Sequence, residues 1–252
     1  MTRIILHGCN GHMGKVIVGL VSEDAGMQIV AGVDIADQGK NDFPVYTKLS
    51  DCQAEADVVV DFSSARAVDA VLSYCEERKL PLVECTTGLS EEQLAHLQKT
   101  SEKVAVLKSA NMSLGINVLM KLLKEAARVL APAGFDVEVV EKHHHLKVDA
   151  PSGTALALAD SVNEAMDNSY HYVYDRSQRR EQRDAKEIGI SAVRGGNIVG
   201  EHEVIFAGTD EVVTFTHTAF SKAVFGKGAV EAARFLAGKG PGLYDMSNVI
   251  EG

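Results

Sequence analysis

Short apolar runs alternate with amphipathic segments through the first half of the chain. Strands are predicted where the runs are short and apolar, at residues 2–7, 28–34, 57–62, 80–86 and 104–107. Helices are predicted between them, beginning near Val16 and covering about 64–79 and 91–102, the last opened by a capping-box pair, Ser90 and Gln93. This alternation predicts a Rossmann-type α/β domain, in which helices flank a doubly wound parallel sheet.

The pattern changes from Ser113 onward. Apolar positions between 116 and 130 have helical spacing, and strand-like runs follow at 136–141, 188–194, 203–207 and 212–218. A final amphipathic helix is predicted at 228–237. We therefore expect one domain made of residues 1–112 plus 223–252, and a second α+β domain with a mixed sheet at 113–222. The polar stretch 167–186 is interpreted as a solvated loop without a catalytic role.

A glycine-rich turn, GCNGHMG, joins the first predicted strand to the first helix at residues 8–14. Its spacing, G-x-x-G-x-x-G, is one step away from the dinucleotide fingerprint, which is a weak signal by itself. The second strand, however, ends in Asp34, twenty positions beyond Gly14, where a carboxylate that binds ribose hydroxyls is expected. The context favours dinucleotide binding over a purely structural turn.

The stretch EKHHHLKVDAPSGTA, residues 141–155, carries most of the candidate chemistry. Its three histidines, His143, His144 and His145, follow an alternating run, so we expect them where a strand runs out into a loop. Imidazoles can exchange a proton near neutral pH, and Lys147 adds a cation that favours an anionic ligand.

The second half of this stretch predicts the start of a helix. Asp149 or Ser152 can cap it, and Pro151 suits its first turn. The backbone N–H groups of Gly153 and Thr154 would then point toward an incoming oxyanion. An inert loop and a metal site are the alternatives. We expect no metal, because neighbouring residues of an extended segment face opposite ways and no set at metal-ligand spacing accompanies them.

Composition narrows the class of protein. The chain has 252 residues and a formal net charge of −10, which argues against nucleic acid as a partner. Its four cysteines form no C-x-x-C pair, so reduced thiols in a cytoplasmic protein are the simplest interpretation. No run resembles a signal peptide or approaches the length of a membrane span, so we expect no membrane association.

Six motifs in order resemble the 4-hydroxy-tetrahydrodipicolinate reductase (dihydrodipicolinate reductase) family, and the resemblance spans nearly the whole chain. The motifs are GCNGHMG, CTTG, SANMSLG, EKHHHLKVDAPSGTA, VRGGNIVGEHEVIF and GLYDMSNVI. The resemblance implies reduction of a cyclic dicarboxylate by hydride from NADH or NADPH with loss of water, in lysine and diaminopimelate biosynthesis. It also implies a cytoplasmic homotetramer assembled through the sheets of the second domain.

The resemblance also implies roles for individual residues. His143 matches the proton donor and acceptor, Lys147 a second proton donor, and His144 a substrate contact, while Gly153 and Thr154 match the cradle for a substrate carboxylate. Asp34 matches the ribose contact. The remaining cofactor positions are the pyrophosphate loop, Gly8, Cys9, Asn10, Gly11, His12 and Met13, and the nicotinamide segments, Cys85, Thr86 and Thr87 with Ser109, Ala110, Asn111 and Met112.

Departures from the family pattern bear on cofactor choice. Ile35 and His12 stand where some relatives carry arginine, so a 2′-phosphate would meet Asp34 without a guanidinium beside it. We therefore expect a preference for NADH over NADPH, although Lys15 or Lys40 could reach a phosphate. Cys85 replaces a common glycine, and Met112 stands at the position of a common aromatic residue.

Two other functions fit part of the sequence. A nicotinamide enzyme acting on an amino-acid aldehyde would use the same first domain, but would not need the histidine and lysine cradle. A nucleotide-sensing protein without catalysis would also bind the dinucleotide. The two classes differ in whether the chain turns substrate over.

Overall fold

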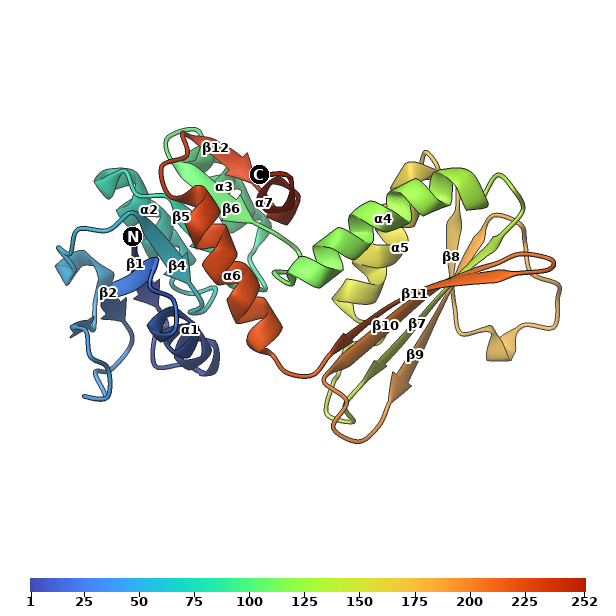
Figure 1. Cartoon of the computed structure of the whole chain (residues 1–252), viewed down its shortest axis with the longest axis horizontal. Coiled ribbons are helices and arrows are strands. Elements are labelled where there is room, and N and C mark those ends of the chain that lie inside the picture. Colours follow the sequence, from blue (N-terminus) through green and yellow to red (C-terminus); the bar gives the residue numbers. More distant parts are fainter. The chain divides into compact units, whose positions relative to one another are not determined.

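The computed structural model describes all 252 residues, which divide into two compact units (Figure 1). Unit 1 comprises residues 1–113 and 223–252, and unit 2 comprises residues 114–222. The last part of the chain therefore returns to the unit in which it began. No helix is long and apolar enough to cross a membrane.

Unit 1 contains a seven-stranded sheet in which every neighbouring pair is parallel. The strands, in spatial order, are β12 (Gly242–Tyr244), β6 (Ala105–Lys108), β5 (Leu82–Glu84), β4 (Val58–Asp61), β1 (Thr2–His7), β2 (Met27–Val33) and β3 (Val45–Tyr46). The order runs outward from β1 on one side and resumes at β4 on the other. Such a reversal is where doubly wound sheets bind ligands, and the predicted fold class is confirmed.

The helices of unit 1 form two pairs, seen against the sheet in Figure 1. Side chains of α2 and α3 pack with Ile5, Val59 and Val106 in a buried core, while α1 and α6 contact each other and the sheet. The predicted capping box is present, because Ser90 Oγ accepts the Gln93 N–H. The bounds are α1 (His12–Ser22), η1 (Leu49–Asp51), α2 (Val68–Arg78), α3 (Glu91–Ser101), α6 (Ala223–Leu236) and α7 (Met246–Glu251).

Several predicted boundaries were wrong. Helix α1 begins at the glycine turn rather than near Val16, and α2 begins four residues late because the N–H of Ala67 donates to Ser64 in a tight turn. Helix α6 begins five residues early and includes Gly226 and Gly228. A Cβ on Gly226 would lie 2.9 Å from Val16, so close helix packing outweighs the low helix propensity of glycine. The elements β3, η1, β12 and α7 were too short to predict.

Unit 2 contains a mixed five-stranded sheet, as predicted. The strands, in spatial order, are β11 (Val212–Ala219), β10 (Gly200–Ala207), β7 (Asp136–His143), β9 (Glu187–Arg194) and β8 (His171–Tyr174). Strand β7 is antiparallel to β10 and parallel to β9. Helices α4 (Leu114–Leu130) and α5 (Gly153–Ala165) pack together, and their apolar side chains share one core with Val137, Val139 and Phe206.

The prediction of a solvated loop at 167–186 was wrong in part. Strand β8 lies within it, pairs with β9, and buries Val173. The 3₁₀ helix η2 (Arg176–Gln178) follows. Arg183 then fastens the segment to strand β7 through bonds to Asp136 and Glu138 of 2.7 and 2.9 Å. These bonds join residues more than forty positions apart, so no local pattern signals them.

Candidate active site

The glycine turn between β1 and α1 has the geometry of an anion site. Gly8 has φ +80°, and a Cβ there would lie 2.6 Å from the carbonyl oxygen of Phe62. A Cβ on Gly14 would overlap the carbonyl of Gly8. Only glycine allows the backbone segments to approach each other this closely. The turn places the N-terminus of α1 at the carboxyl edge of the sheet. The N–H groups there can receive a pyrophosphate.

Asp34 follows β2 and braces this turn. One carboxylate oxygen accepts the N–H of Asn10 at 2.8 Å, and the other accepts the N–H of Ile35 at the same distance. The Asn10 amide donates to the carbonyl of Ala36 at 2.7 Å and accepts a bond from Asn41 at 3.0 Å. The structure therefore brings Asp34 to the glycine loop.

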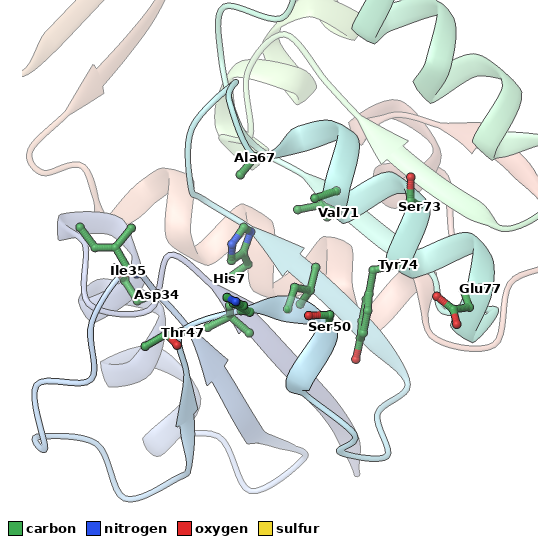
Figure 2. Close-up of a pocket in the computed structure, with 14 residues that line it drawn as sticks. His7, Asp34, Ile35, Thr47, Ser50, Ala67, Val71, Ser73, Tyr74 and Glu77 are labelled. Atoms are coloured by element: carbon green, nitrogen blue, oxygen red, sulfur yellow. Dashed lines mark hydrogen bonds between the residues drawn. The ribbon is translucent and has the colours of Figure 1, made fainter.

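A cavity of about 570 Å³ lies beside Asp34 (Figure 2). Ile35 lies at its edge, and its side chain is 96% exposed. Sequence reasoning missed the rest of the lining. It comes from the ends of β1 and β2, the segment around η1, and α2 with the residue before it: His7, Val33, Thr47, Lys48, Leu49, Ser50, Ala67, Ala70, Val71, Ser73, Tyr74 and Glu77. Lys48 is the cation in this lining. It lies between β3 and η1, two elements that are too short to leave a sequence signal.

Buried acids lie beneath the predicted nicotinamide segment. His7, Asp61 and Glu84 occupy one registered row across β1, β4 and β5. His7 Nδ1 lies 2.8 Å from Asp61, whose other oxygen accepts the Thr86 hydroxyl at 3.0 Å. The N–H of Thr86 donates to Glu84 at 2.7 Å, and Lys108 donates to the Thr86 carbonyl at 2.6 Å. The structure thus fixes the backbone of this segment from below.

The charges of these acids differ. Burial alone would raise the pKa of Asp61, but the hydrogen bond and charge of His7 lower it. Burial, and then the charge of Asp61, raise the pKa of Glu84 to about 8. Burial and the nearby acids also raise the pKa of the Cys85 thiol well above its ordinary value, so Cys85 stays protonated. The second predicted segment, Ser109 to Met112, follows β6 at the same edge of the sheet.

In unit 2 the histidine cluster lies at the end of β7. The strand runs two residues further than predicted, so His143 is its last residue and the loop begins at His144. Glu141 and His143 alternate onto the buried face, and Glu141 is completely buried. His143 Nδ1 lies 2.6 Å from Glu141, which also accepts two bonds of 2.7 Å from Arg194 at the end of β9.

The other side chains of the cluster differ in their partners. The buried Nδ1 of His144 has no hydrogen-bond partner. His145 is exposed and Nδ1 lies 2.9 Å from the Gly196 carbonyl oxygen. Lys147 forms an ion pair of 2.8 Å with Asp149, which lowers the pKa of that carboxyl. An unsatisfied imidazole and an ammonium group held only by an exposed carboxylate are suited to an incoming anion.

Helix α5 begins directly beside this cluster. Ser152 is its cap, since its hydroxyl accepts the N–H of Ala155 at 3.1 Å. Pro151 precedes the cap, so its predicted place in the first turn of the helix was wrong. Gly153 and Thr154 open the helix, and a Cβ on Gly153 would meet open space. The space beside Gly153 at the start of the helix is therefore open to an oxyanion.

Three residues of this site were missed from the sequence. Glu141, Arg194 and His202 complete it, and the last two lie within VRGGNIVGEHEVIF. His202 lies edge-on to the His143 ring with centroids 5.1 Å apart, and its Nε2 is 3.0 Å from the Ser152 hydroxyl. Burial, and then the charge of His143, lower the pKa of His202 to about 4. The alternation of β7 could have paired Glu141 with His143. No group of three His, Cys, Asp or Glu side chains forms a candidate metal site.

Comparison with known proteins gives matches over both units. The sequence model described as "Dihydrodipicolinate reductase, N-terminus" matches residues 2–112, and "Dihydrodipicolinate reductase, C-terminus" matches residues 115–250. A 4-hydroxy-tetrahydrodipicolinate reductase of Caldanaerobacter subterraneus subsp. tengcongensis is 53% identical, with 100% of this chain and 99% of the relative covered. One from Clostridium tetani is 48% identical, with coverage of 98% and 96%.

Solved structures show the same likeness. A dipicolinate-bound dihydrodipicolinate reductase from a Paenisporosarcina species has a TM-score of 0.82 and 25% identity, with 99% of each chain covered. GenD2 from gentamicin A biosynthesis, in complex with NAD, has a TM-score of 0.62 at 12% identity, with 99% of this chain and 90% of GenD2 covered. At that identity the second likeness shows the fold alone.

Proposed function

This chain belongs to the dihydrodipicolinate reductase family, and we propose that it reduces 4-hydroxy-tetrahydrodipicolinate to tetrahydrodipicolinate. It is thus an NAD(P)H-dependent enzyme of lysine and diaminopimelate biosynthesis. The net reaction adds one hydride from the nicotinamide and one proton, and releases one water. The observation that carries the proposal is the buried pair of Glu141 and His143 beside the capped start of α5, because it joins a proton-exchanging group to an anion site.

We propose that unit 2 binds the substrate dianion. His143 exchanges a proton with the substrate, and Lys147 donates a second proton near a carboxylate. Loss of water releases one proton from the substrate ring, so the net uptake stays at one proton. His144 contacts the substrate through the imidazole whose Nδ1 lacks a protein partner. Gly153 and Thr154 hold a carboxylate with the N–H groups at the start of α5. A solved structure of a relative supports this arrangement, because it is described as dipicolinate-bound. Dipicolinate is a planar dicarboxylate of a size similar to that of the proposed substrate.

We propose that unit 1 binds the nicotinamide cofactor. Residues 8–13 hold the pyrophosphate at the start of α1, and Asp34 accepts bonds from ribose hydroxyls. Residues 85–87 and 109–112 contact the nicotinamide end. Two observations support this proposal. A Cβ on Gly8 or Gly14 would collide with neighbouring backbone in the turn, and a cavity lies beside Asp34. The cofactor supplies the hydride, and the residues of unit 1 position it.

We propose that NADH is preferred over NADPH. A 2′-phosphate would approach Asp34, a carboxylate, next to the apolar side chain of Ile35. Because like charges repel, the 2′-phosphorylated ribose of NADPH is disfavoured beside Asp34. Lys48 is the cation lining the same cavity, and it is the group through which NADPH could regain affinity.

The test measures loss of NADH or NADPH absorbance with substrate generated in place from pyruvate and aspartate semialdehyde by the preceding synthase. We expect rapid oxidation that depends on the synthase and a higher kcat/KM with NADH. Equal or better kcat/KM with NADPH would overturn the preference. Tight cofactor binding with no oxidation would favour a sensing role instead.

A pair of substitutions separates enzyme from sensor. His143→Gln and Lys147→Ala should each lower turnover while leaving NADH affinity unchanged, because both lie in unit 2. His145→Gln is the matched control, since His145 is exposed and bonded only to a backbone carbonyl. Loss of NADH affinity in either active-site variant would contradict the assignment of the cofactor to unit 1.

We also propose a homotetramer assembled through the sheet of unit 2, working in the cytoplasm. Helices α4 and α5 share a single core with the sheet. Other apolar side chains on the strands, including Val193 and Val212, are exposed and could be covered by a second copy of the chain. All four cysteines are free, as expected in a reducing compartment. Light scattering coupled to size-exclusion chromatography should give four times the chain mass of 27.0 kDa.

A further inference from the structure

Glu141 is a buried carboxylate that holds three parts of unit 2 together. One of its oxygens is 2.6 Å from His143 Nδ1 and 2.7 Å from Arg194 Nη1. The other accepts Arg194 Nη2 at 2.7 Å and the N–H of Ser152 at 3.0 Å. The end of β7, the end of β9 and the cap of α5 therefore meet on one side chain.

The charge of Glu141 determines what His143 can do. Burial alone would raise the pKa of Glu141, but the hydrogen bonds from Arg194 and then from His143 lower it. The carboxylate is therefore ionised and can only accept hydrogen bonds. The hydrogen between Glu141 and His143 must consequently be carried by Nδ1 of the ring.

This arrangement leaves Nε2 of His143 for proton exchange, since it makes no hydrogen bond within unit 2. In the charged ring both nitrogens carry a hydrogen. When Nε2 delivers its proton to the substrate, the Nδ1 hydrogen remains on the ring and stays directed at Glu141. A histidine held by a carboxylate in this way keeps one tautomer and one orientation throughout the exchange.

The neighbouring histidine does not compete for this role. Ser152 Oγ accepts the N–H of Ala155, so its own hydrogen can be donated to His202 Nε2 at 3.0 Å. Because burial lowers the pKa of His202 to about 4, that ring is neutral and can accept this hydrogen bond. The positive charge of a protonated His143 is therefore balanced by Glu141 rather than opposed by His202.

We propose that Glu141, clamped by Arg194, is a positioning residue that fixes His143 as the Nδ1–H tautomer and so directs Nε2 to the substrate. The same carboxylate holds the N–H of Ser152, so it also sets where α5 begins relative to the imidazole. The inference rests on the proposed function, because it takes His143 as the group that exchanges a proton with substrate.

The tautomer can be measured without turnover. Nitrogen-15 NMR of the histidine side chains in the wild-type chain, with His143 assigned by comparison with His143→Gln, reports which ring nitrogen carries the hydrogen in the neutral form of the ring. We expect that form of His143 to be protonated at Nδ1 and bare at Nε2. A His143 ring protonated at Nε2 would overturn the inference. This result holds whether or not the proposed substrate is the true one, so the two proposals can fail separately.

The kinetic test uses Glu141→Gln, which keeps the size of the side chain but removes its charge and offers an N–H to Nδ1. We expect kcat to fall by about 100-fold or more, by analogy with lost orienting carboxylates elsewhere, with NADH affinity within twofold of wild type. Dipicolinate serves as the probe for the substrate site, and its affinity should fall much less than kcat.

Glu138→Gln is the matched control, because Glu138 lies on the same strand but its carboxylate pairs with Arg183 instead of with His143. It should leave kcat within twofold of wild type. A folded Glu141→Gln chain with wild-type kcat, or one that loses kcat while its NMR spectrum retains the Nδ1–H tautomer of His143, would overturn the positioning role. Where Glu141→Gln fails to fold, the tautomer in the wild-type chain decides the question.

Discussion

Asp61 and Glu84 are registered neighbours on β4 and β5, and both side chains are completely buried, yet they hold opposite protonation states. His7 lowers the pKa of Asp61 despite burial, while burial and the charge of Asp61 raise the pKa of Glu84 to about 8. At neutral pH the pair therefore carries one charge and one proton. The dependence of unit 1 stability on pH follows from this difference.

Glu84→Gln should make unit 1 less sensitive to alkaline pH. Unfolded Glu84 releases its proton near its ordinary pKa of 4.5, whereas the folded group retains it to about 8. Between these values the folded state binds more protons than the unfolded state, so stability falls as pH rises, with a limiting slope of about 1.4 kcal/mol per pH unit. Urea unfolding at pH 5.5 and 8.5 measures this loss.

Glu77→Gln, on the exposed side of α2, is the control and should behave as wild type. The same pH dependence of stability in both variants would contradict the assignment of the raised pKa to Glu84.

Ile35→Arg should shift cofactor choice toward NADPH. The side chain is exposed at the edge of the cavity beside Asp34, so a guanidinium there can pair with a 2′-phosphate. We expect the ratio of kcat/KM for NADPH to that for NADH to rise by about tenfold or more. A tenfold change corresponds to a free-energy difference of roughly 1.4 kcal/mol. Ile35→Gln is the neutral control and should leave the ratio unchanged. An unchanged ratio in the arginine variant would place the ribose elsewhere.

Gly14→Ala and Gly19→Ala should have opposite effects, although both lie in α1. A Cβ on Gly14 would meet the carbonyl oxygen of Cys9 at 2.6 Å, whereas a Cβ on Gly19 would meet nothing within 4 Å. The first substitution should lower the melting temperature and weaken NADH binding. The second should stabilise the chain by about 0.5–1 kcal/mol, the usual gain for alanine over glycine in a helix. Thermal unfolding measures the stability of each variant, and titration measures its NADH affinity. Equal behaviour of the two variants would contradict the close approach of backbone at Gly14.

Arg183→Lys should release the segment that follows β8. The guanidinium binds Glu138 and Asp136 and donates to the carbonyl of Val137 at 2.8 Å, a fork that one ammonium group cannot reproduce. We expect a loss of about 1–3 kcal/mol in the stability of unit 2 and faster trypsin cleavage at Arg179 and Arg180, detected by mass spectrometry. Arg179→Lys is the control, because its ion pair with Glu181 is exposed and worth little. Unchanged cleavage in the Arg183 variant would show that other contacts order the segment.

The sequence predicted those features that depend on local pattern. The buried runs of β1, β4 and β6, the capping box at Ser90 and the glycine turn all have local causes. Segments ordered by distant partners were missed. Strand β8 depends on pairing with β9, and the path after it depends on the bonds of Arg183 to β7.

The candidate site divides in the same way. The histidines, Lys147 and the start of α5 lie within fifteen residues, so their proximity was predictable. Arg194 is fifty-three positions from Glu141, and His202 fifty from Ser152, and only the registers of β7 with β9 and of β7 with β10 bring them together. The cavity beside Asp34 was missed for a related reason, because short elements around η1 supply much of its lining.

The return of the chain to unit 1 determines the order in which the two units can be completed on the ribosome. All strands of unit 2 have been synthesised by residue 219, whereas the sheet of unit 1 gains its edge strand β12 only at residues 242–244, and α6, which contacts β1, β4, β5 and β6, ends at Leu236. The nascent N-terminal segment must therefore remain without part of its core while unit 2 emerges and can fold. A chain that stalls before Ala223 would present a finished second unit and an exposed apolar sheet surface in the first, a natural target for chaperones or proteases.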